Sequence, residues 1–438
     1  MRRTSLVILI LLLVASVLAA CGGGAEQGAG QDTQGQKQGQ NGSSNGKQEK
    51  TTVTFWAVSA DEPVFRALAD QFTEQNPNIE IKITGHASDP HKEALKVAAA
   101  SGTLPDMWFN WGGTLGSYFP ENGFSYDFKQ HAEDNQWGDK YIGSSLELVE
   151  LGGQVSGVPW KVSALGFYFR KDLFEKYDIE PPATFEEFEQ VLQKLKENGI
   201  TPITTGGKGG WHPMRIMEGL IEYYAGAEGH DQLMALEQSW EDNQAVIDAY
   251  AKWKEWSDKG YFPKGFLTLD PLEAKFPLFK GEAAMILDSP GFNKLLIDDE
   301  QDPELYGFFP MPTDTDRISS YVVMLQVNKS SAKDVQDAAI AFAEFITSPE
   351  VIQENLDIVG FPQARLGSPI SEKMPIGSTV VETMSNNGAF LITDQALPQE
   401  VLQKFFQAQD DVSLQRMTPE EAAAFVQEGI NNYKDRMK

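Results

Sequence analysis

The chain has 438 residues, of which 41% are hydrophobic, 11% aromatic and 23% charged. These fractions are typical of a soluble globular protein and exclude a fibrous or disordered one, and the length predicts roughly two to three domains. The one cysteine excludes a disulfide scaffold. The formal charge of −27, from 36 basic and 63 acidic residues, would repel a phosphate backbone, so no nucleic-acid partner is expected.

Residues 1–20 predict a secretory signal peptide. Two arginines precede an apolar run over 6–20, which is shorter than the roughly 20 residues that a membrane-spanning helix needs. The segment Leu18-Ala19-Ala20-Cys21 resembles the bacterial lipobox, in which the cysteine is acylated, as with palmitate, and the peptide is cut just before it. We therefore expect lipidation at Cys21. The alternative is a plain cleaved signal with an incidental free thiol.

The stretch that follows Cys21 consists mainly of Gly, Gln, Asn, Ser and Lys up to residue 50. It cannot bury enough apolar surface to offset its chain entropy, so residues 21–50 are expected to form the lipid anchor and a flexible tether. No later apolar run is long enough to span a membrane. The expected location is the extracellular face of a bacterial cell membrane, attached through the N-terminal lipid only.

The globular part opens with a β-α-β-α-β pattern. Its predicted elements are a strand over 52–56, a helix that begins at Pro63 and stops at Asn76-Pro77, a strand over 79–83, a helix over 91–100 and a strand over 106–111. This alternation predicts a parallel sheet covered by helices. Ligands bind beyond the carboxyl ends of such strands, which places Ser59, Asp61, Asn110 and Trp111 at a candidate site.

A second α/β pattern begins near residue 166. Thr184 and Glu187 predict a capping box at the start of a helix, and a strand over 200–204 leads into a flexible glycine-rich loop over 206–210 with Trp211 at its tip. Further predicted elements are strands over 167–169, 285–288 and 321–327, helices over 334–347 and 398–409, and a last helix capped by Thr418 and Glu421. Two α/β lobes fit this order.

Sequence motifs for catalysis, nucleotide binding or metal binding are missing. The chain has no G-x-S-x-G elbow, no H-E-x-x-H pair, no Walker lysine loop and no EF-hand loop. The five histidines show no metal-ligand spacing. We therefore expect no cofactor, no metal site and no catalytic residue.

Aromatic residues at loop and strand ends indicate a carbohydrate site instead. Sugars present apolar C–H faces framed by hydroxyls, so they are bound by flat rings with polar side chains around them. Trp111 and Trp211 lie beside glycine pairs, where a close-packed core is harder to form, and we assign them to the site. Tryptophans in the middle of predicted strands and helices are expected in the core: Trp56, Trp108, Trp253 and Trp256.

A succession of short motifs resembles one known family along nearly the whole stretch from Thr51 to Lys438. The motifs are Phe55-Trp56, Leu104-Pro105-Asp106, Asn110-Trp111-Gly112-Gly113, Gly157-Val158-Pro159-Trp160, Tyr168-Phe169-Arg170-Lys171-Asp172-Leu173-Phe174, Phe279-Lys280-Gly281-Glu282-Ala283-Ala284-Met285 and Phe345-Ile346-Thr347-Ser348-Pro349-Glu350. Their order and spacing resemble the extracellular solute-binding proteins of carbohydrate ABC importers, in the maltose- and multiple-sugar-binding branch.

This resemblance implies a two-lobed α/β, periplasmic-binding-protein-like fold of the maltose-binding type, with the ligand cleft between the lobes. The first lobe would comprise 51–162 plus 290–333, and the second 163–289 plus 334–438, with hinges near Ser163 and Asp288. The ligand-binding residues that it implies are Ser59, Asp61, Asn110, Trp111, Trp160, Ser163, Trp211 and Asp288, with Phe292 as a displaced stacking residue and Gln363 or Arg365 reaching the cleft.

The function expected from the resemblance is that of a monomeric, non-catalytic receptor. It would capture a di- or oligosaccharide outside the cell, close on it, and deliver it to ABC permease subunits served by a cytoplasmic ATPase. A secreted glycoside hydrolase that uses Asp61 and Asp288 is the alternative, since the separation of two carboxylates cannot be read from sequence. A receptor for a peptide or polyamine is a third possibility, disfavoured by the aromatic, weakly charged candidate site.

Replacement of Cys21 by serine tests the lipid anchor. The variant loses the acylated thiol, so we expect the protein to move from the membrane fraction into the medium. Fractionation of cells that express each form, followed by immunoblotting, measures this change. Continued membrane association of the Cys21→Ser protein would contradict the assignment.

Overall fold

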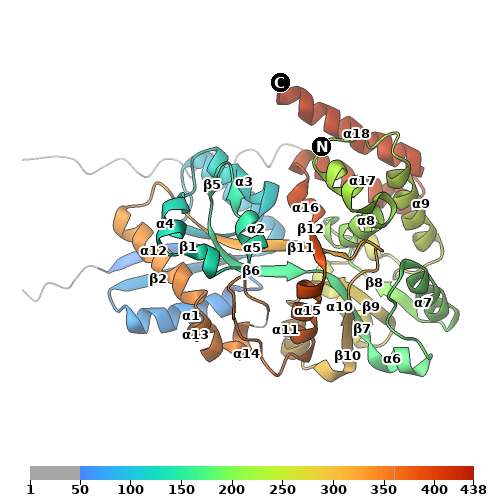
Figure 1. The fold of residues 1–438 in the computed structure, drawn as a ribbon, viewed down its shortest axis with the longest axis horizontal. Coiled ribbons are helices and arrows are strands. Elements are labelled where there is room, and N and C mark those ends of the chain that lie inside the picture. The colour runs from blue at the N-terminus through green and yellow to red at the C-terminus, as the bar shows by residue number, and fades with distance from the viewer. Residues whose placement is uncertain (1–49, 360) are drawn as a thin grey trace, which may run out of the picture. The chain divides into compact units, whose positions relative to one another are not determined.

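Two β-sheets organise the protein in the computed structural model, which describes residues 50–359 and 361–438 (Figure 1). The six-stranded sheet of the first lobe has the order β12-β11-β3-β1-β2, and β6 also pairs with β11. Its strands are β1 (Thr51–Val58), β2 (Ile79–His86), β3 (Met107–Trp111), β6 (Val158–Ala164), β11 (Arg317–Val327) and β12 (Gly388–Leu391). β1 runs parallel to β2 and β3, whereas β11 is antiparallel to β3 and β6.

The four-stranded sheet of the second lobe has the order β10-β7-β9-β8. Its strands are β7 (Gly166–Arg170), β8 (Thr201–Thr204), β9 (Ala283–Asp288) and β10 (Tyr306–Phe309). β8 and β9 are parallel, and β7 is antiparallel to both of its neighbours. A separate two-stranded ribbon joins β4 (Glu150–Leu151) to β5 (Gln154–Val155).

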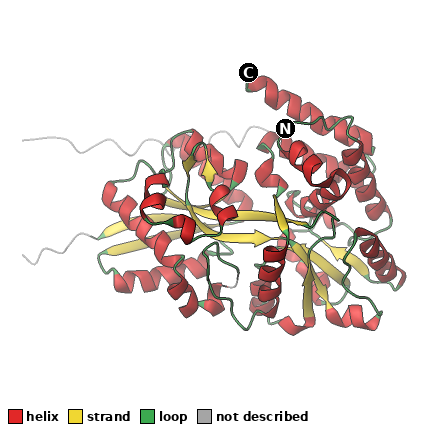
Figure 2. Cartoon of the chain, in the orientation of Figure 1, coloured by secondary structure: helices red, strands yellow, loops and turns green. Residues whose placement is uncertain are grey.

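Helices pack around both sheets (Figure 2). The helices of the first half of the chain are α1 (Glu62–Gln75), α2 (Ser88–Ser101), α3 (Gly113–Glu121), α4 (Lys129–Asp134), α5 (Gly143–Glu147), α6 (Lys171–Lys176), α7 (Phe185–Glu197) and α8 (Trp211–Met234). Those of the second half are α9 (Gln244–Asp258), α10 (Lys275–Phe279), α11 (Phe292–Asp298), α12 (Lys333–Ile346), α13 (Pro349–Glu354), α14 (Leu356–Val359), α15 (Pro375–Asn386), α16 (Thr393–Ala396), α17 (Gln399–Ser413) and α18 (Pro419–Arg436).

Local sequence signals account for the ends of several helices. Both predicted capping boxes are present: Thr184 accepts a hydrogen bond from the backbone of Glu187, and Thr418 accepts one from Glu421, with the reciprocal bonds formed. The opening β-α-β-α-β pattern is confirmed as β1, α1, β2, α2 and β3. Trp108, Trp253 and Trp256 are fully buried as predicted, whereas Trp56 is partly exposed.

Two adjacent strands carry the chain between the lobes. β6 of the first sheet continues almost directly into β7 of the second, and β11 lies antiparallel to β6 along its length (Figure 1). In this register Ser163 pairs with Tyr321 and Lys161 pairs with Val323. Because successive side chains of a strand point to opposite faces, these four residues share one face of the crossing strands. Val162 and Ala164 lie on the other face.

The lobe boundaries differ from the predicted ones at several places, among them β12, which pairs with β11 in the sheet of the first lobe. β10 and α11, expected in the first lobe, belong to the second, because β10 pairs with β7 and Phe292 of α11 packs against Tyr168. α12 was assigned to the second lobe, yet its buried face, which includes Phe342, packs with Phe55 of β1 in the first. The chain therefore returns to the first lobe through β11 and not at Asp288.

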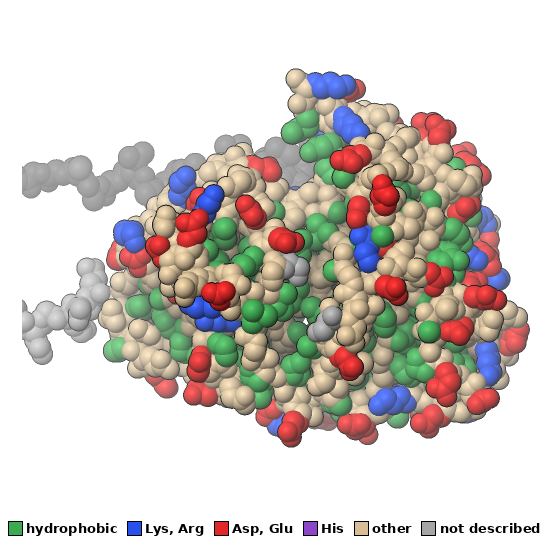
Figure 3. Space-filling view, viewed as in Figure 1, with side chains coloured by type: hydrophobic (Ala, Val, Ile, Leu, Met, Phe, Trp, Pro, Cys, Tyr) green, Lys and Arg blue, Asp and Glu red, His purple; other side chains and the backbone are tan. Residues whose placement is uncertain are grey.

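The predicted signal peptide and Cys21 lie outside the described residues. Within the described part of the chain, none of the helices combines the length and the apolar character that crossing a membrane requires. Acidic side chains are scattered over the face shown in Figure 3 instead of gathering in one patch. This distribution is typical of a solvated outer surface.

The short helix α16 is wedged between elements of the two lobes. On one side the Thr114 hydroxyl of α3 donates to the carbonyl of Leu397, just after α16, over 2.8 Å. On the other side the backbone N–H of Thr393 donates to the Glu218 carboxylate of α8 over 2.8 Å. Gly113 has a φ of +60°, and a Cβ at this position would clash with the carbonyl oxygen of Gln395. The Gly112-Gly113 pair therefore allows α16 to approach α3.

Replacement of Gly113 by alanine is expected to destabilise the protein by more than the same change at Gly123. Both glycines have left-handed backbones, but a Cβ at Gly123 would meet nothing within 4 Å. Gly123→Ala should therefore cost only the backbone penalty of about 1–2 kcal/mol, and Gly113→Ala should add the displacement of α16. Urea unfolding of both variants measures the difference, and equal losses would show that α16 does not depend on this glycine.

Candidate functional site

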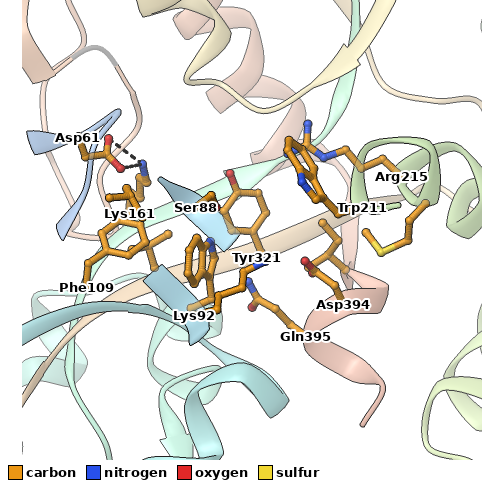
Figure 4. A pocket seen from close by; sticks show the side chains of 15 residues that line it. Asp61, Ser88, Lys92, Phe109, Lys161, Trp211, Arg215, Tyr321, Asp394 and Gln395 are labelled. Atoms are coloured by element: carbon orange, nitrogen blue, oxygen red, sulfur yellow. Dashed lines mark hydrogen bonds and ion pairs between the residues drawn. The ribbon is translucent and has the colours of Figure 1, made fainter. Parts of the chain in front are cut away.

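A pocket lies between the lobes on the face of β6 and β11 that carries Lys161 and Tyr321 (Figure 4). The first lobe contributes residues from β3, from α2 and from the start of α1. The second contributes α8, and the wedged helix α16 completes the wall. The lining residues are Val58, Asp61, Ser88, Lys92, Phe109, Trp111, Lys161, Trp211, Met214, Arg215, Tyr321, Val323, Ile392, Asp394 and Gln395.

Ion pairs neutralise two of the cations in this pocket. Lys161 Nζ lies 3.0 Å from the Asp61 carboxylate, and both side chains are 13% exposed. On the opposite wall Arg215 Nη1 lies 2.7 Å from Asp288 Oδ1. Burial of a charge is costly unless a partner and hydrogen bonds satisfy it, so each pair holds its side chains in place. The pocket thereby presents polar groups with little uncompensated charge.

Each tryptophan of the pocket is covered by a cation. Lys92 Nζ lies 5.0 Å from the centre of the Trp111 ring, and the Arg215 guanidinium carbon lies 4.8 Å from that of Trp211. Both distances are within the range of a cation–π interaction. These contacts fix the orientation of two aromatic rings that come from different lobes.

Buried polar atoms without a protein partner line the wall of the second lobe and α16. Arg215 Nε, Asp394 Oδ1 and Gln395 Oε1 are buried and make no hydrogen bond. Burial also raises the pKa of Asp394, against the opposing charges of Lys92 and Arg215. Buried polar groups are normally satisfied, so these three atoms lack the partner that such groups usually have.

Hydrogen bonds tie the glycine-rich loop before Trp211, which was predicted to be flexible, to neighbouring elements. The backbone N–H of Gly206 donates to His212 Nδ1, and His212 Nε2 lies 3.1 Å from the carbonyl oxygen of Leu287. Burial lowers the pKa of His212 to about 4, so the ring is neutral and bridges the loop to β9. Trp211 is the first residue of α8, which places its ring at the pocket wall.

Three of the residues predicted from the sequence line the pocket: Asp61, Trp111 and Trp211. Asp288 lies behind the wall as the partner of Arg215. Ser59 follows β1, is exposed and is not among the lining residues. These positions agree with the rule that sites form beyond the carboxyl ends of strands.

The other predicted residues do not line this pocket. Asn110 is buried and donates to Gln326 Oε1 over 2.8 Å, because it points to the opposite face of β3 from Trp111. Trp160 and Phe292 are each 1% exposed in the cores of their lobes, and Ser163 is buried. Arg365 lines a different cavity.

Sequence reasoning missed several lining residues for identifiable reasons. Lys161 follows the predicted Trp160 in β6. Because successive side chains of a strand point to opposite faces, Lys161 points into the pocket and Trp160 into the core. Asp394 and Gln395 carry no local motif and reach the pocket only because α16 is wedged between α3 and α8. Tyr321 lies within a predicted strand and Arg215 within helix α8. Residues in the middle of such elements are usually expected in the core.

Glu218 fixes the position of α16. Its carboxyl group is fully buried, accepts the N–H of Thr393 and is hydrogen-bonded to the Ser319 hydroxyl of β11. Burial raises the pKa of Glu218 to about 8. The residue touches no part of the pocket, but it holds Asp394 and Gln395 on the pocket wall.

No group of three or more His, Cys, Asp or Glu side chains that could hold a metal ion exists among residues 50–359 and 361–438. Apart from Asp394, the charged side chains of the pocket are arranged as the ion pairs and cation–π contacts described above. The arrangement provides for binding through rings and hydrogen bonds.

Residues 56–353 match the sequence model of a protein family, the bacterial extracellular solute-binding proteins. The chain belongs to this family. The names of the matched proteins describe solute-binding and ABC transporter extracellular-binding proteins. This solute-binding protein is 25% identical over 441 residues to an uncharacterized ABC transporter extracellular-binding protein of Pyrococcus horikoshii, with 98% of this chain and 95% of the relative aligned. It is also 24% identical over 179 residues to a multiple sugar-binding protein of Streptococcus mutans, covering 38% and 39% of the two chains.

Solved structures confirm the two-lobed fold of this solute-binding protein. A structure described under xylan utilization by Caldanaerobius polysaccharolyticus superimposes with a TM-score of 0.79 at 24% identity, covering 86% of this chain and 100% of that one. A maltose-bound protein of T. maritima gives 0.74 at 18% identity, over 87% and 99%. The fold class is therefore α/β of the maltose-binding type.

The pKa of Glu218 predicts how stability depends on pH. In the unfolded chain this carboxyl ionises near its ordinary value of 4.5, but in the folded protein only near 8. Between these values the unfolded state is ionised and the folded state is protonated, so the free energy of unfolding should fall as pH rises, by up to about 1.4 kcal/mol per pH unit.

The Glu218→Gln variant removes this dependence. The amide oxygen still accepts the N–H of Thr393, and the amide N–H can donate to Ser319. The variant should therefore become more stable than the wild type as pH rises from 5 to 8. Urea unfolding at pH 5, 6.5 and 8 measures the difference, and parallel pH profiles for the two proteins would refute the assignment.

Proposed function

We propose that this solute-binding protein captures a di- or oligosaccharide in the pocket between its lobes and delivers it to the permease of an ABC transporter driven by a cytoplasmic ATPase. One observation carries the proposal. Trp111 and Trp211 face a single pocket from different lobes, with unpartnered polar atoms of Asp394 and Gln395 beside them. Flat rings with hydrogen-bonding groups around them complement the C–H faces and hydroxyls of a sugar.

The proposed mechanism is closure of the lobes around the ligand. A sugar that touches both walls binds the closed state better than the open state, and it shifts the population towards closure by that difference in affinity. β6 and β11 are the segments about which the lobes would turn. The permease would recognise the closed form, and a lipid at Cys21 with a tether over 21–50 would keep the receptor near it.

The ligands for which similar proteins are named support a carbohydrate ligand. Besides the multiple sugar-binding protein, the fold neighbours include a chitin oligosaccharide binding protein and a raffinose complex. The charge arrangement of the pocket disfavours two other classes. A polyamine would have to compete with Lys161 and Arg215 for the carboxylates of Asp61 and Asp288, and it would also meet Lys92. Of the two carboxylates that the glycosidase alternative would use, only Asp61 lines the pocket, whereas Asp288 lies outside its lining as the partner of Arg215.

Calorimetry and thermal shift with malto-, xylo-, raffinose-type and gluco-oligosaccharides test the proposal. At least one series should bind with a stoichiometry of one and raise the melting temperature by mass action, and chromatography should detect no cleaved product. Product formation would favour the hydrolase, and binding of putrescine or a peptide in preference to every sugar would refute a carbohydrate ligand.

The Trp211→Ala variant identifies the site. Loss of one stacking ring should weaken the binding of the best oligosaccharide by about tenfold or more, or about 1.4 kcal/mol. Phe276→Ala is the matched control, because Phe276 is an aromatic residue that is 44% exposed and lies outside the pocket. Equal affinities of the wild type and Trp211→Ala would remove Trp211 from the site.

A further inference from the structure

A second cavity lies behind the two crossing strands. It has a volume of about 390 Å³, compared with about 170 Å³ for the pocket between the lobes. Val162 and Ala164 of β6 and Ile318 and Ser320 of β11 line it. By strand alternation these residues point away from Lys161 and Tyr321. The pocket and this rear cavity therefore lie on opposite faces of the same pair of strands.

The walls of the rear cavity are aliphatic. Ile142, Ile318, Ile370 and Met384 line it together with Val162, and none of its lining residues is aromatic. A sugar site needs flat rings, whereas an alkyl chain gains by removing its surface from water against such walls. The volume lies within the range of about 300–1,000 Å³ that is typical of small-molecule sites.

One end of the rear cavity is polar and carries a cation. Arg365 lines it, and its guanidinium carbon lies 5.5 Å from the ring of Tyr141. Within the described ranges 50–359 and 361–438 no acidic side chain forms an ion pair with Arg365. Gln363 is only 4% exposed, and its Oε1 atom and the Ser368 hydroxyl are buried without a hydrogen-bond partner. The Ser368 hydroxyl can donate to an acceptor in the cavity, whereas Gln363 Oε1 can only accept a hydrogen bond.

We propose that the rear cavity binds a small amphipathic carboxylate. The carboxylate accepts hydrogen bonds from Arg365, the geometry for which a guanidinium is suited, and it can accept one from the Ser368 hydroxyl. The aliphatic chain lies against Val162 and Ile318. A neutral apolar ligand would leave the Ser368 hydroxyl without a hydrogen-bond partner and Arg365 without a counter-charge, and an amphipathic amine would be repelled by Arg365.

The position of the cavity implies coupling to the pocket. On one side it is bounded by Gln363, whose backbone bridges Lys161 of the first lobe. On the other side is α15, whose Ile376 and Val380 pack with Tyr168 of the second lobe. A change in the angle between the lobes moves these walls, so the carboxylate has different affinities for the open and closed states. By linkage it then changes the affinity of the pocket.

Hexanoate is the probe for the site, with hexan-1-ol and hexylamine as controls of equal chain length. Calorimetry on the purified protein should give one hexanoate per chain, bound at least tenfold more tightly than either control. Arg365→Gln should weaken hexanoate binding about 10- to 100-fold through loss of a charge-assisted hydrogen bond. Equal binding of hexanoate and hexan-1-ol, or no binding of hexanoate at millimolar concentration, would overturn the proposal.

Two further variants locate the hexanoate. Ala389 is an exposed residue of β12 that lines the cavity, so Ala389→Trp should fill the cavity and abolish hexanoate binding. This variant tests the site independently of whether Arg365→Gln folds. Phe276→Ala lies outside both cavities and should leave hexanoate binding unchanged. Retention of hexanoate binding in Ala389→Trp, or loss of it in Phe276→Ala, would refute the site.

The coupling is measured separately, by titrating the best oligosaccharide with and without saturating hexanoate. This measurement rests on the proposed function, whereas the binding of hexanoate alone does not. A change in oligosaccharide affinity of about fivefold or more, lost in Arg365→Gln, is the expected result. An unchanged affinity would refute the coupling.

Discussion

The antiparallel register of β6 and β11 is the constraint on which both cavities depend. Lys161 pairs with Val323 and Ser163 pairs with Tyr321, so the pocket between the lobes receives a cation and an aromatic ring from adjacent strands. The alternate residues give the rear cavity its aliphatic wall. A slip of one residue would exchange the two sets of side chains. One register therefore determines the chemistry of both faces.

Charge compensation distinguishes the two cavities. In the pocket, Lys161 and Arg215 each have an acidic partner, so a charged ligand would have to compete with an existing ion pair. A neutral ligand with hydroxyl groups meets no such cost and can satisfy the unpartnered atoms of Asp394 and Gln395. In the rear cavity Arg365 has no acidic partner among the described residues. The ligands proposed for the two cavities therefore differ in charge.

The sequence predicts the elements well because their signals are local. Pro63 and the boxes at Thr184 and Thr418 mark helix starts through contacts within a few residues. Asp61 and Trp111 are found because strand ends converge at one edge of a sheet.

The rest of the site depends on information that is not local. Whether Trp160 or Lys161 points into the pocket depends on which face of β6 each side chain occupies. The pairing of β6 with β11 also shifts in register between Val323 and Met324. Asp394 and Gln395 depend on where a four-residue helix from the end of the chain is placed.

The hydrogen bonds of α16 determine whether Asp394 and Gln395 are held by the first lobe or by the second. Towards α3 it is held by a hydrogen bond from Thr114 to Leu397, and towards α8 by the buried carboxyl of Glu218, which binds Thr393 and Ser319 together. Hydrogen bonds are stronger and costlier to break in a water-free interior. In the proposed closure we therefore expect the contact with α3 to yield first, so that Asp394 and Gln395 move together with Trp211.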